Sequence, residues 1–501
     1  MPDFDAVIVG SGAGGGALAF KLAKAGKKVL IIEAGGFYNT DEFTRFELQA
    51  YRNLWWQERF TSNFRVSGGK LRDEIALGMG RCVGGSTTIF TAVAQRAFAE
   101  NIDAWYTETK TVNDLGEPIS LSDLIPNYEQ VESETGVSKY LNWDSGVRRL
   151  QEGFTRIGYP LEPVDAYINP TSCDHSGCLF GCPTGAKRGS LLAYVIPALY
   201  AGAEIYTNTY VERVLLRRIP EDNSGRVLEA YGVEYTDARG NSGKVSARIV
   251  VLSAGALETP QILLRSNIPD LAAHSSSAEQ IGRNLAANTG TMVFGTFEET
   301  LNNWEMHPLS AHLIQFAREK DGGFLLEMSE VMEGPLGFSL VVTDEDGVPI
   351  VGEKLTSAMK QYPKMAGVFV SIHDANNGSV TLDGHGKEVF YKPVVREDLA
   401  RVSKAKELAK QGMAAAGARD FYGSIFISHH VQGTCRMGED KRVSVTNSNC
   451  EMHDVARLFV CDGSLIPRVL DVNPSLTIYA LADRLSRHLL SVGNTGLWGG
   501  S

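Results

Sequence analysis

The stretch Asp5-Ala6-Val7-Ile8-Val9-Gly10-Ser11-Gly12-Ala13-Gly14-Gly15 near the start of the chain decides the fold. A short β-branched run that ends in glycines and continues into a helical pattern indicates a buried parallel strand, a tight turn and a helix. The run Val29-Leu30-Ile31-Ile32 then indicates a second strand. Strand, turn, helix and strand in this order form one βαβ unit, which predicts the opening of a doubly wound sheet.

The turn has the spacing G-x-G-x-x-G, with glycines at Gly10, Gly12 and Gly15. In a dinucleotide site the first glycine permits the tight turn, the second lets the pyrophosphate approach the backbone, and the third lets the helix pack on the strand. Glu33 follows the second strand, 23 residues after Gly10, where its carboxylate can accept hydrogen bonds from a ribose diol. The alternative is that these glycines only form a turn. A turn alone does not explain why the strands, the helix and the carboxylate stand at these positions around it. The unit therefore predicts a bound nucleotide, either NAD or FAD.

Length and composition limit the class of protein. With 501 residues and 43% hydrophobic content, the chain should divide into two domain-sized units. A formal charge of −11 without a basic run argues against a nucleic-acid partner. The chain opens without a signal-peptide pattern, and no stretch reaches the roughly 18 apolar residues of a membrane-spanning helix. Seven cysteines do not suggest a disulfide framework in a chain of this size, so we expect a cytoplasmic protein, with partner-mediated export left open.

The rest of the chain alternates between two kinds of pattern. The segments that continue the parallel-sheet pattern are 203–206, 211–215, 249–252 and 458–461, and a helical pattern at about 475–491 follows them. Segment 291–424 instead combines strands such as 367–372 with turns and a helix at about 397–416. We expect an α/β protein with a Rossmann-like nucleotide-binding domain (1–100, 190–290 and 425–501). It is interleaved with a substrate domain (101–189 and 291–424) built on a mostly antiparallel sheet with flanking helices.

Several separated motifs resemble the glucose–methanol–choline (GMC) oxidoreductase family. Gly78-Met79-Gly80-Arg81-Cys82-Val83-Gly84-Gly85-Ser86-Thr87 resembles the family's glycine-rich flavin segment, and residues 253–266 are similar to its second signature, with Asn267 where a glycine usually follows. Residues 281–285 and Val460-Cys461-Asp462-Gly463-Ser464 with Pro467 also match family segments. Their order along the chain is specific to this family, and together they span nearly its whole length.

The resemblance implies that the nucleotide-binding domain holds FAD. The residues that would contact it are Gly10, Gly12, Gly15, Glu33, Gly84, Gly85, Ser86, Thr87, Val211, Ala254, Gly255 and Asp462. Val211 stands at the position beside the adenine, and Asp462 would approach the ribityl or pyrophosphate region. Some relatives attach the flavin through a histidine shortly after the Gly-Gly pair, where this chain has Thr88, Ile89 and Phe90. We therefore expect non-covalent FAD.

The segment His430-Val431-Gln432-Gly433-Thr434-Cys435-Arg436-Met437-Gly438 resembles the family's catalytic segment. Removal of hydride from an alcohol carbon also requires loss of the hydroxyl proton, which a neutral imidazole can accept. His430 is the candidate base, and the neighbouring His429 is its competitor. Asn473, followed by Pro474, matches the position of a second polar residue and can hold the substrate oxygen without titrating. The structural alternatives are that His430 is a histidine satisfied in the core and that Asn473-Pro474 is an ordinary turn before a helix.

A second unusual feature is the cysteine loop, with Cys173, Cys178 and Cys182 in ten residues and Pro183 directly after them. Closely spaced thiolates are typical of iron–sulfur clusters. Some relatives carry a three-iron (3Fe-4S) cluster on a similar loop and pass electrons to a cytochrome, so these three residues are candidate metal ligands. A disulfide or zinc site and plain buried or reactive thiols remain open as alternatives.

The family resemblance predicts oxidation of an alcohol or sugar hydroxyl, with oxygen, a quinone or a cytochrome as the electron acceptor. A non-redox hydroxynitrile lyase on the same fold is the second hypothesis, because the His430 and Asn473 pair fits both. A subunit that passes electrons through an iron–sulfur cluster is the third. The substrate depends on segments 37–66 and 291–424, where aromatic residues that could surround an entrance are Trp55, Trp56, Phe60, Phe64 and Trp304.

Overall fold

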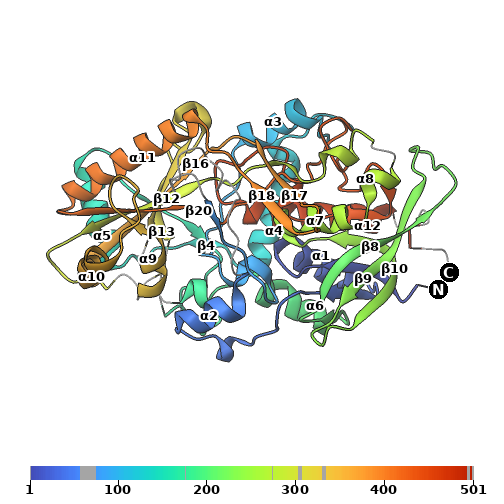
Figure 1. Cartoon of the computed structure of the whole chain (residues 1–501), viewed down its shortest axis with the longest axis horizontal. Coiled ribbons are helices and arrows are strands. Elements are labelled where there is room, and N and C mark those ends of the chain that lie inside the picture. The colour runs from blue at the N-terminus through green and yellow to red at the C-terminus, as the bar shows by residue number, and fades with distance from the viewer. Residues whose placement is uncertain are drawn as a thin grey trace.

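The computed structural model describes residues 2–56, 75–174, 177–272, 275–302, 307, 309–329, 334–492 and 497–498. The fold is mixed α/β, with two large sheets that occupy the two halves of an elongated molecule (Figure 1). The half on the right in that view contains the first strand and the last helix of the chain. The half on the left is built mainly from residues between 290 and 428. The α/β class predicted from the sequence is confirmed.

An eight-stranded sheet forms the first half. Its order is β21-β9-β10-β1-β2-β7, with β22 also paired to β10 and β8 to β9. The parallel strands are β1 (Phe4–Val9), β2 (Val29–Ile32), β7 (Glu204–Tyr206), β22 (Leu458–Val460) and the end of β10 (Ser242–Leu252). The remaining members are β8 (Tyr210–Arg218), β9 (Leu228–Thr236) and β21 (Val455–Ala456). Every residue of β2 is buried, as expected for a parallel strand covered on both faces.

Helices cover this sheet. The helix after the glycine turn, α1 (Ala13–Lys24), packs against the last helix, α12 (Ser475–Val492), and α12 packs against α4 (Leu121–Thr135). The other helices of this half are α3 (Ala99–Thr109), α6 (Ile196–Tyr200), α7 (Gly255–Arg265) and α8 (Ile268–Leu271). Lys21 of α1 joins the packing, since its ammonium lies 2.5 Å from a carboxylate oxygen of Glu134 and 2.9 Å from one of Asp483. The beginning and the end of the chain therefore share one core.

A nine-stranded, mostly antiparallel sheet forms the second half. Its order is β15-β19-β12-β16-β14-β13-β5, with β20 paired to both β12 and β3. Its strands are β3 (Ile75–Leu77), β5 (Glu162–Pro163), β12 (Gly290–Thr296), β13 (Leu309–Leu313), β14 (Phe324–Ser329), β15 (Val342–Thr343), β16 (Met365–Ile372), β19 (Phe421–Ser424) and β20 (Phe426–Ser428). In a three-stranded sheet β17 (Gly378–Leu382) lies between β11 (Arg283–Leu285) and β18 (Glu388–Tyr391), and in a two-stranded sheet β4 (Ser138–Lys139) pairs with β6 (Asp165–Ala166).

The two faces of the nine-stranded sheet have different neighbours. One face packs on α5 (Ser145–Arg156) and α11 (Arg396–Ala415), with Ala311, Leu326 and Val368 among the buried residues of that core. Near the other face lie α9 (Pro335–Val341) and α10 (Gly352–Gln361), with α2 (Glu47–Leu54) against α9. The carboxylate of Glu47 accepts backbone N–H groups of Leu336 and Gly337, which joins α2 to the start of α9. The second face also points toward the cavity described below.

The proposed segment boundaries can be compared with the two sheets. Strands of the eight-stranded sheet come from residues 4–32, 204–252 and 455–460. The segment 101–189 is divided, because α4 packs on α12 of the first half whereas α5 packs on α11 of the second. The domain boundaries drawn from the sequence stay predictions.

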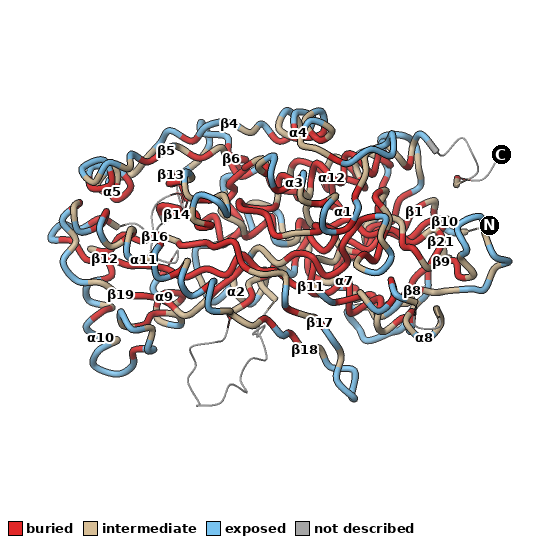
Figure 2. Tube along the Cα trace, turned by 90° about the horizontal axis from the view of Figure 1, so that it is seen from above, coloured by how far each residue is buried: buried red, intermediate tan, exposed pale blue. Residues whose placement is uncertain are grey.

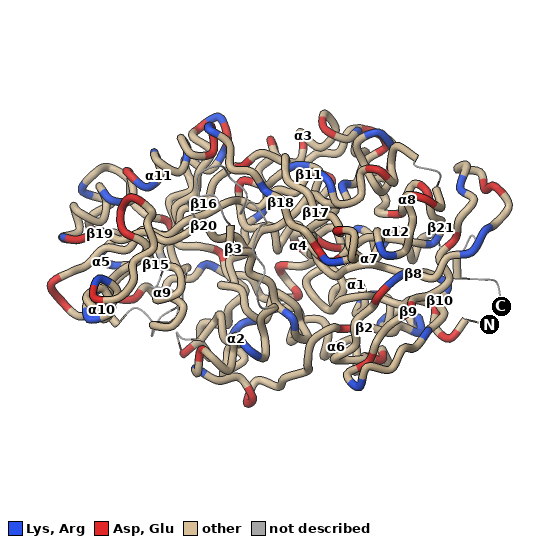
Figure 3. The backbone as a smooth tube through the Cα atoms, viewed as in Figure 1, with Lys and Arg blue, Asp and Glu red and all other residues tan. Residues whose placement is uncertain are grey.

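Buried residues run through the centre of both halves, and charged residues of both signs lie mainly around the outside (Figures 2 and 3). None of the helices in the described part of the chain has the length and apolar composition that crossing a bilayer requires.

Candidate active site

The glycine turn is packed so closely that most of its glycines are required by neighbouring backbone. Gly10 has a φ of +95°, and a Cβ there would lie 2.3 Å from the carbonyl oxygen of Ser253. At Gly14 a Cβ would lie 1.7 Å from the carbonyl oxygen of Cys461, and at Gly15 it would lie 2.1 Å from that of Gly10. These contacts let α1 start directly against the ends of the parallel strands.

Gly12 differs from its neighbours. Its φ of −66° suits any residue, and a Cβ built on it would meet no protein atom within 4 Å. Gly12 is the N-cap of α1 and lines a large cavity. Protein packing therefore does not require glycine at this position, whereas a ligand that lies against the backbone does.

Glu33 is buried at the end of β2 and faces the same turn. Ser11 donates to one of its carboxylate oxygens from both its backbone N–H (3.0 Å) and its hydroxyl (2.7 Å), and Gly35 N–H donates to the other (2.9 Å). Burial raises the pKa of Glu33, and these three hydrogen bonds oppose the rise. Each oxygen keeps acceptor capacity, so the predicted contact with a ribose hydroxyl fits the carboxylate's position on the cavity wall.

The predicted flavin segment forms a short 3₁₀ turn, Gly85–Thr88, against the glycine turn. Gly84 has a φ of +93°, and its N–H donates to the Ser11 hydroxyl at 2.9 Å. Gly85, Ser86 and Thr87 line the cavity, whereas Gly84 and Gly15 only support it. The two glycine-rich segments thus form adjacent parts of one wall.

Asp462 joins two further segments of this wall. Its carboxylate accepts the backbone N–H of Gly255 (2.9 Å), the hydroxyl of Thr259 (2.6 Å), and both the N–H and the hydroxyl of Ser464. Burial raises its pKa, and these hydrogen bonds counteract the effect. Because four donors already occupy this carboxylate, its main role here is to hold the turn at Ala254 and Gly255 in place.

The cavity connects these walls into one site. The space between its lining atoms measures about 1910 Å³, part of it open to solvent. The predicted residues that line it are Gly10, Gly12, Glu33, Gly85, Ser86, Thr87, Val211, Ala254, Gly255, Asp462, His430 and Asn473. Residues from the second sheet complete the lining, among them Met292, Leu309, Phe369 and Ile427. The site therefore lies between the parallel sheet and the antiparallel sheet.

His430 and Asn473 meet at this cavity. Asn473 Nδ2 lies 3.3 Å from His430 Nε2, and Asn473 Oδ1 is buried without a hydrogen-bond partner among the described residues. Burial and then the neighbouring His429 lower the pKa of His430 to about 3, while burial lowers the pKa of His429 to about 4. His430 is therefore a neutral acceptor throughout the pH range in which proteins usually work. The His429 ring lies instead edge-on against Trp55, 5.7 Å between centroids.

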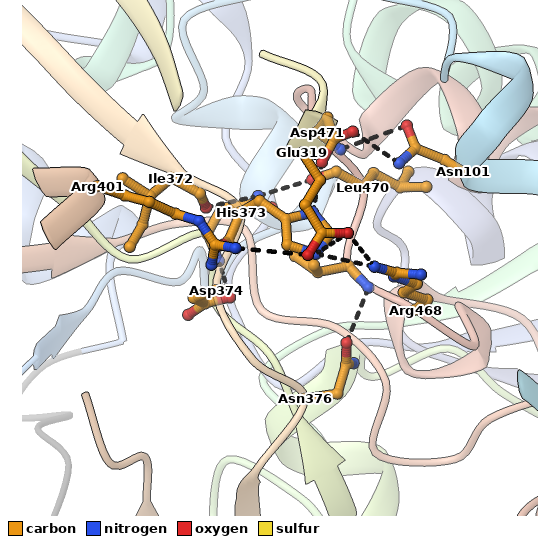
Figure 4. Close-up of polar contacts among 12 residues, drawn as sticks. Asn101, Glu319, Ile372, His373, Asp374, Asn376, Arg401, Arg468, Leu470 and Asp471 are labelled. Atoms are coloured by element: carbon orange, nitrogen blue, oxygen red, sulfur yellow. Dashed lines mark hydrogen bonds and ion pairs between the residues drawn. The ribbon is translucent and has the colours of Figure 1, made fainter. Parts of the chain in front are cut away.

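A polar network fixes the loop that carries Asn473 (Figure 4). His373 Nδ1 lies 2.5 Å from Asp471 Oδ1, and Asn101 donates to Asp471 Oδ2 at 3.0 Å. Glu319 accepts from Arg468 on the same loop. Asp471 stands two residues before Asn473, so contacts from both halves of the molecule determine where the amide lies.

The comparison with protein families decides the identity of this arrangement. A model of the N-terminal part of the GMC oxidoreductases matches residues 5–289, and a model of their C-terminal part matches residues 365–482. The chain belongs to the GMC oxidoreductase family. Both conserved parts of a GMC oxidoreductase thus contribute to the cavity, the first through the glycine turn and the second through His430 and Asn473.

Individual relatives cover almost the whole of this GMC oxidoreductase. It is 26% identical to the long-chain-alcohol oxidase FAO4B of Arabidopsis thaliana, over 97% of this chain and 67% of the relative. It is 25% identical to the 6'''-hydroxyparomomycin C oxidase of Streptomyces lividus, over 97% of this chain and 91% of the relative. Among solved structures, pyridoxine 4-oxidase from Mesorbium loti superposes with a TM-score of 0.72 at 18% identity, covering 98% of this chain and 99% of that one.

The residues of this GMC oxidoreductase fit a flavin dinucleotide. A Cβ on Gly12 would extend into the cavity, at the N-terminus of a helix whose first turn carries no acidic side chain. Such a terminus attracts a pyrophosphate through its unpaired N–H groups and its dipole. Glu33 could accept from the ribose, and Gly78, Gly80 and Gly85 place backbone without side chains on the wall of the cavity that His430 and Asn473 also line. These residues would hold FAD.

The structure gives no support to iron–sulfur ligation by Cys173, Cys178 and Cys182. In the described ranges no group of three or more His, Cys, Asp or Glu side chains could hold a metal ion. A buried lysine organises the loop instead, since the Lys187 ammonium donates to the carbonyl oxygens of Thr88, Phe90 and Cys178. The Lys187 N–H also donates to the Cys182 sulfur at 3.3 Å. Lys187 thus joins Cys178 and Cys182 to the segment at Thr88 and Phe90.

Of the predicted aromatic entrance, Trp55 and Trp56 line the cavity. Phe60, Phe64 and Trp304 lie outside the described residues. The cavity residues of the second sheet could not be predicted from the sequence, because alternating apolar residues in a strand carry no signal that separates a cavity wall from a core. Nor could the link that Ser11 makes between Glu33 and Gly84, since a serine in a glycine turn is common.

Proposed function

We propose that this GMC oxidoreductase oxidises a primary alcohol to an aldehyde, with His430 as the base and Asn473 as the oxygen-binding group. The observation that supports the proposal is the 3.3 Å approach of Asn473 Nδ2 to His430 Nε2 on the wall of the cavity that begins at the glycine turn. An alcohol oxygen that lies beside both nitrogens, within hydrogen-bond reach of each, would donate its proton to Nε2. The same oxygen would accept a hydrogen bond from Nδ2.

The chain's own groups would act on the hydroxyl in two ways. The neutral imidazole of His430 accepts the proton, and burial keeps it unprotonated before the reaction because it lowers the His430 pKa. The Asn473 amide donates toward the oxygen as negative charge develops there. Bound FAD would supply the acceptor for the hydride that leaves the alcohol carbon.

The lining of the cavity favours an alcohol with an apolar substituent. Trp55, Phe90, Met292, Phe369 and Ile427 surround the space near the pair, and they offer few polar partners for the hydroxyls of a sugar. The relative from Arabidopsis thaliana is named a long-chain-alcohol oxidase, which supports the same class. Because this relative and the one from Streptomyces lividus are both named oxidases, we propose oxygen as the electron acceptor.

We further propose that the flavin is held without a covalent bond. Ile89 and Phe90 line the cavity just after the flavin segment and offer no nucleophile for attachment. Acid precipitation of the holoprotein should therefore release the flavin absorbance into the supernatant. Yellow colour that stays with the precipitate would show a covalent link and overturn the proposal.

The activity itself is tested by anaerobic titration. A series of primary alcohols of increasing chain length should bleach the flavin absorbance, and admission of oxygen should restore it while hydrogen peroxide accumulates. Sugars of similar size should bleach it more slowly. If a cyanohydrin is cleaved while the flavin stays oxidised, the enzyme is a lyase and the proposed oxidation is wrong.

A further inference from the structure

Glu327 is a buried carboxyl group on the second sheet that the chemistry above does not use. It lies on β14, with none of its surface exposed. Directly opposite on β13 is His312, and directly opposite on β16 is Phe369, which in turn pairs with Met292 of β12. Residues directly opposite one another share a face of a sheet. Because Phe369 and Met292 line the cavity, Glu327 lies on the cavity side of the sheet.

The surroundings of Glu327 contain little to compensate its charge. Neither carboxyl oxygen makes a hydrogen bond of ordinary geometry within the described residues, and the one side chain there that stabilises its ionised form is Asn473. Among the described residues, no charged group shifts its pKa. Of the groups that face it, Phe369 is apolar. Burial lowers the pKa of His312 to about 4 and keeps that ring neutral, and its Nδ1 lies 2.5 Å from Gln95 Nε2.

The Asn473 side chain, which lines the cavity, interacts with Glu327. Burial raises the pKa of Glu327 to about 7, and the Asn473 side chain limits the rise because it lies close enough to stabilise the ionised form. The same amide nitrogen faces His430 Nε2. An amide nitrogen carries two hydrogens, so it can serve a carboxylate and the reacting centre at once.

We propose that Glu327 is a positioning residue: its ionised carboxylate accepts one hydrogen of the Asn473 amide and thereby directs the other toward His430 and the substrate oxygen. The inference rests on the proposed function of His430 and Asn473. An amide can rotate by half a turn, which would present its oxygen to the substrate instead. An acceptor behind the nitrogen prevents that rotation, whereas a protonated carboxyl group can donate to the amide oxygen and favours it.

If Glu327 positions the Asn473 amide, the ionisation of Glu327 should change the rate of the reaction with pH. His430 and His429 have pKa values of about 3 and 4, so neither changes charge between pH 5 and 9. Glu327, with a pKa of about 7, does. The rate of flavin reduction by alcohol should increase with pH and level off above about pH 8, as Glu327 ionises.

The first experiment compares kcat between pH 5 and 9 for the wild-type holoenzyme, Glu327→Gln and Glu327→Leu. Glutamine keeps a carbonyl acceptor but cannot ionise, so its rate should lose the inflection near pH 7 and stay within about tenfold of the wild-type plateau. Leucine offers no acceptor and should lower kcat by more than about tenfold at every pH. Glu162→Gln, an exposed carboxylate on β5 opposite His312, is the matched control and should keep the wild-type profile.

The second experiment separates positioning from a merely structural role. If Glu327 acts through Asn473, then Glu327→Leu should lower kcat no further in an Asn473→Ala background. Additive effects, or an inflection near pH 7 that persists in Glu327→Gln, would overturn the proposal. The variants should carry wild-type amounts of flavin, because Glu327 does not line the cavity.

A third measurement needs no substrate, so it remains informative if no alcohol bleaches the flavin. The folded-state pKa of Glu327 is raised, so its contribution to stability is full at acidic pH and is lost as pH rises through about 7. The Tm of Glu327→Gln should therefore exceed that of the wild type at pH 8, and the gap should close toward pH 5. Asn473→Ala should shift the wild-type transition to higher pH. Parallel Tm curves would show that Glu327 does not ionise in this range and would refute its role.

Discussion

Replacement of Gly12 by alanine should yield a folded protein that has lost its flavin. The added Cβ meets no protein atom within 4 Å, and the φ of −66° suits alanine, so the fold should tolerate it. The Cβ would instead occupy the place where a pyrophosphate lies against the backbone. We expect flavin affinity to fall at least about a hundredfold, which corresponds to roughly 2.7 kcal/mol. The ratio of flavin to protein absorbance after purification and the Tm of the apoprotein measure the two effects.

Two further glycines provide contrasts. Gly14→Ala would drive its Cβ into the carbonyl of Cys461 and should prevent folding rather than flavin binding. Gly384→Ala also meets no atom within 4 Å but lies far from the cavity in a turn, and should change neither property. Full flavin occupancy in Gly12→Ala would show that the pyrophosphate does not lie at the turn.

Replacement of His430 by glutamine should slow alcohol oxidation by about 10²- to 10⁴-fold, the range expected for loss of a general base. Glutamine fills similar space and can still accept from Asn473, so flavin content should not change. Stopped-flow measurement of flavin reduction under anaerobic conditions isolates this step from reoxidation. A loss below about tenfold would transfer the role of base to another group.

His429→Gln is the control, because His429 also lines the cavity but packs edge-on against Trp55. The rate of flavin reduction should fall much less in this variant than in His430→Gln.

Both histidines also affect stability. Burial lowers their pKa values in the folded state, so the stability they contribute is present above their ordinary pKa and is lost as pH falls toward about 3. Both variants should therefore resist acid better than the wild type in thermal melts.

The sequence predicted those parts of the fold in which local pattern and tertiary role coincide. The strand at Asp5–Val9, the helix after Gly12 and the final helix are each long, apolar on the correct faces and bounded by glycine or proline. The nine-stranded sheet is harder to predict, because β3, β5 and β20 are two or three residues long and pair with partners far along the chain. Such strands exist only because the tertiary structure supplies their neighbours.

The residues of the candidate site also divide into those that could be predicted from the sequence and those that could not. Gly10 and Gly12 could be predicted because the physics of a tight turn and of an approaching pyrophosphate fixes their spacing. Glu327 could not, because an isolated glutamate in an apolar strand carries no spacing that identifies it. The cysteine loop was misleading for a related reason. Three cysteines close in sequence suggest a common ligand, but the buried ammonium of Lys187 orders that loop instead.

The pairing of β22 with β10, and of α12 with α1, also determines when the flavin site can exist during synthesis. The sheet that holds the glycine turn lacks its strand at 458–460 until that segment has been synthesised. At about 5 to 20 residues per second, the first strand waits roughly 20 to 90 s for this partner. Flavin capture therefore has to follow the synthesis of residues 458–492, and truncations that remove them should abolish it as completely as changes in the glycine turn.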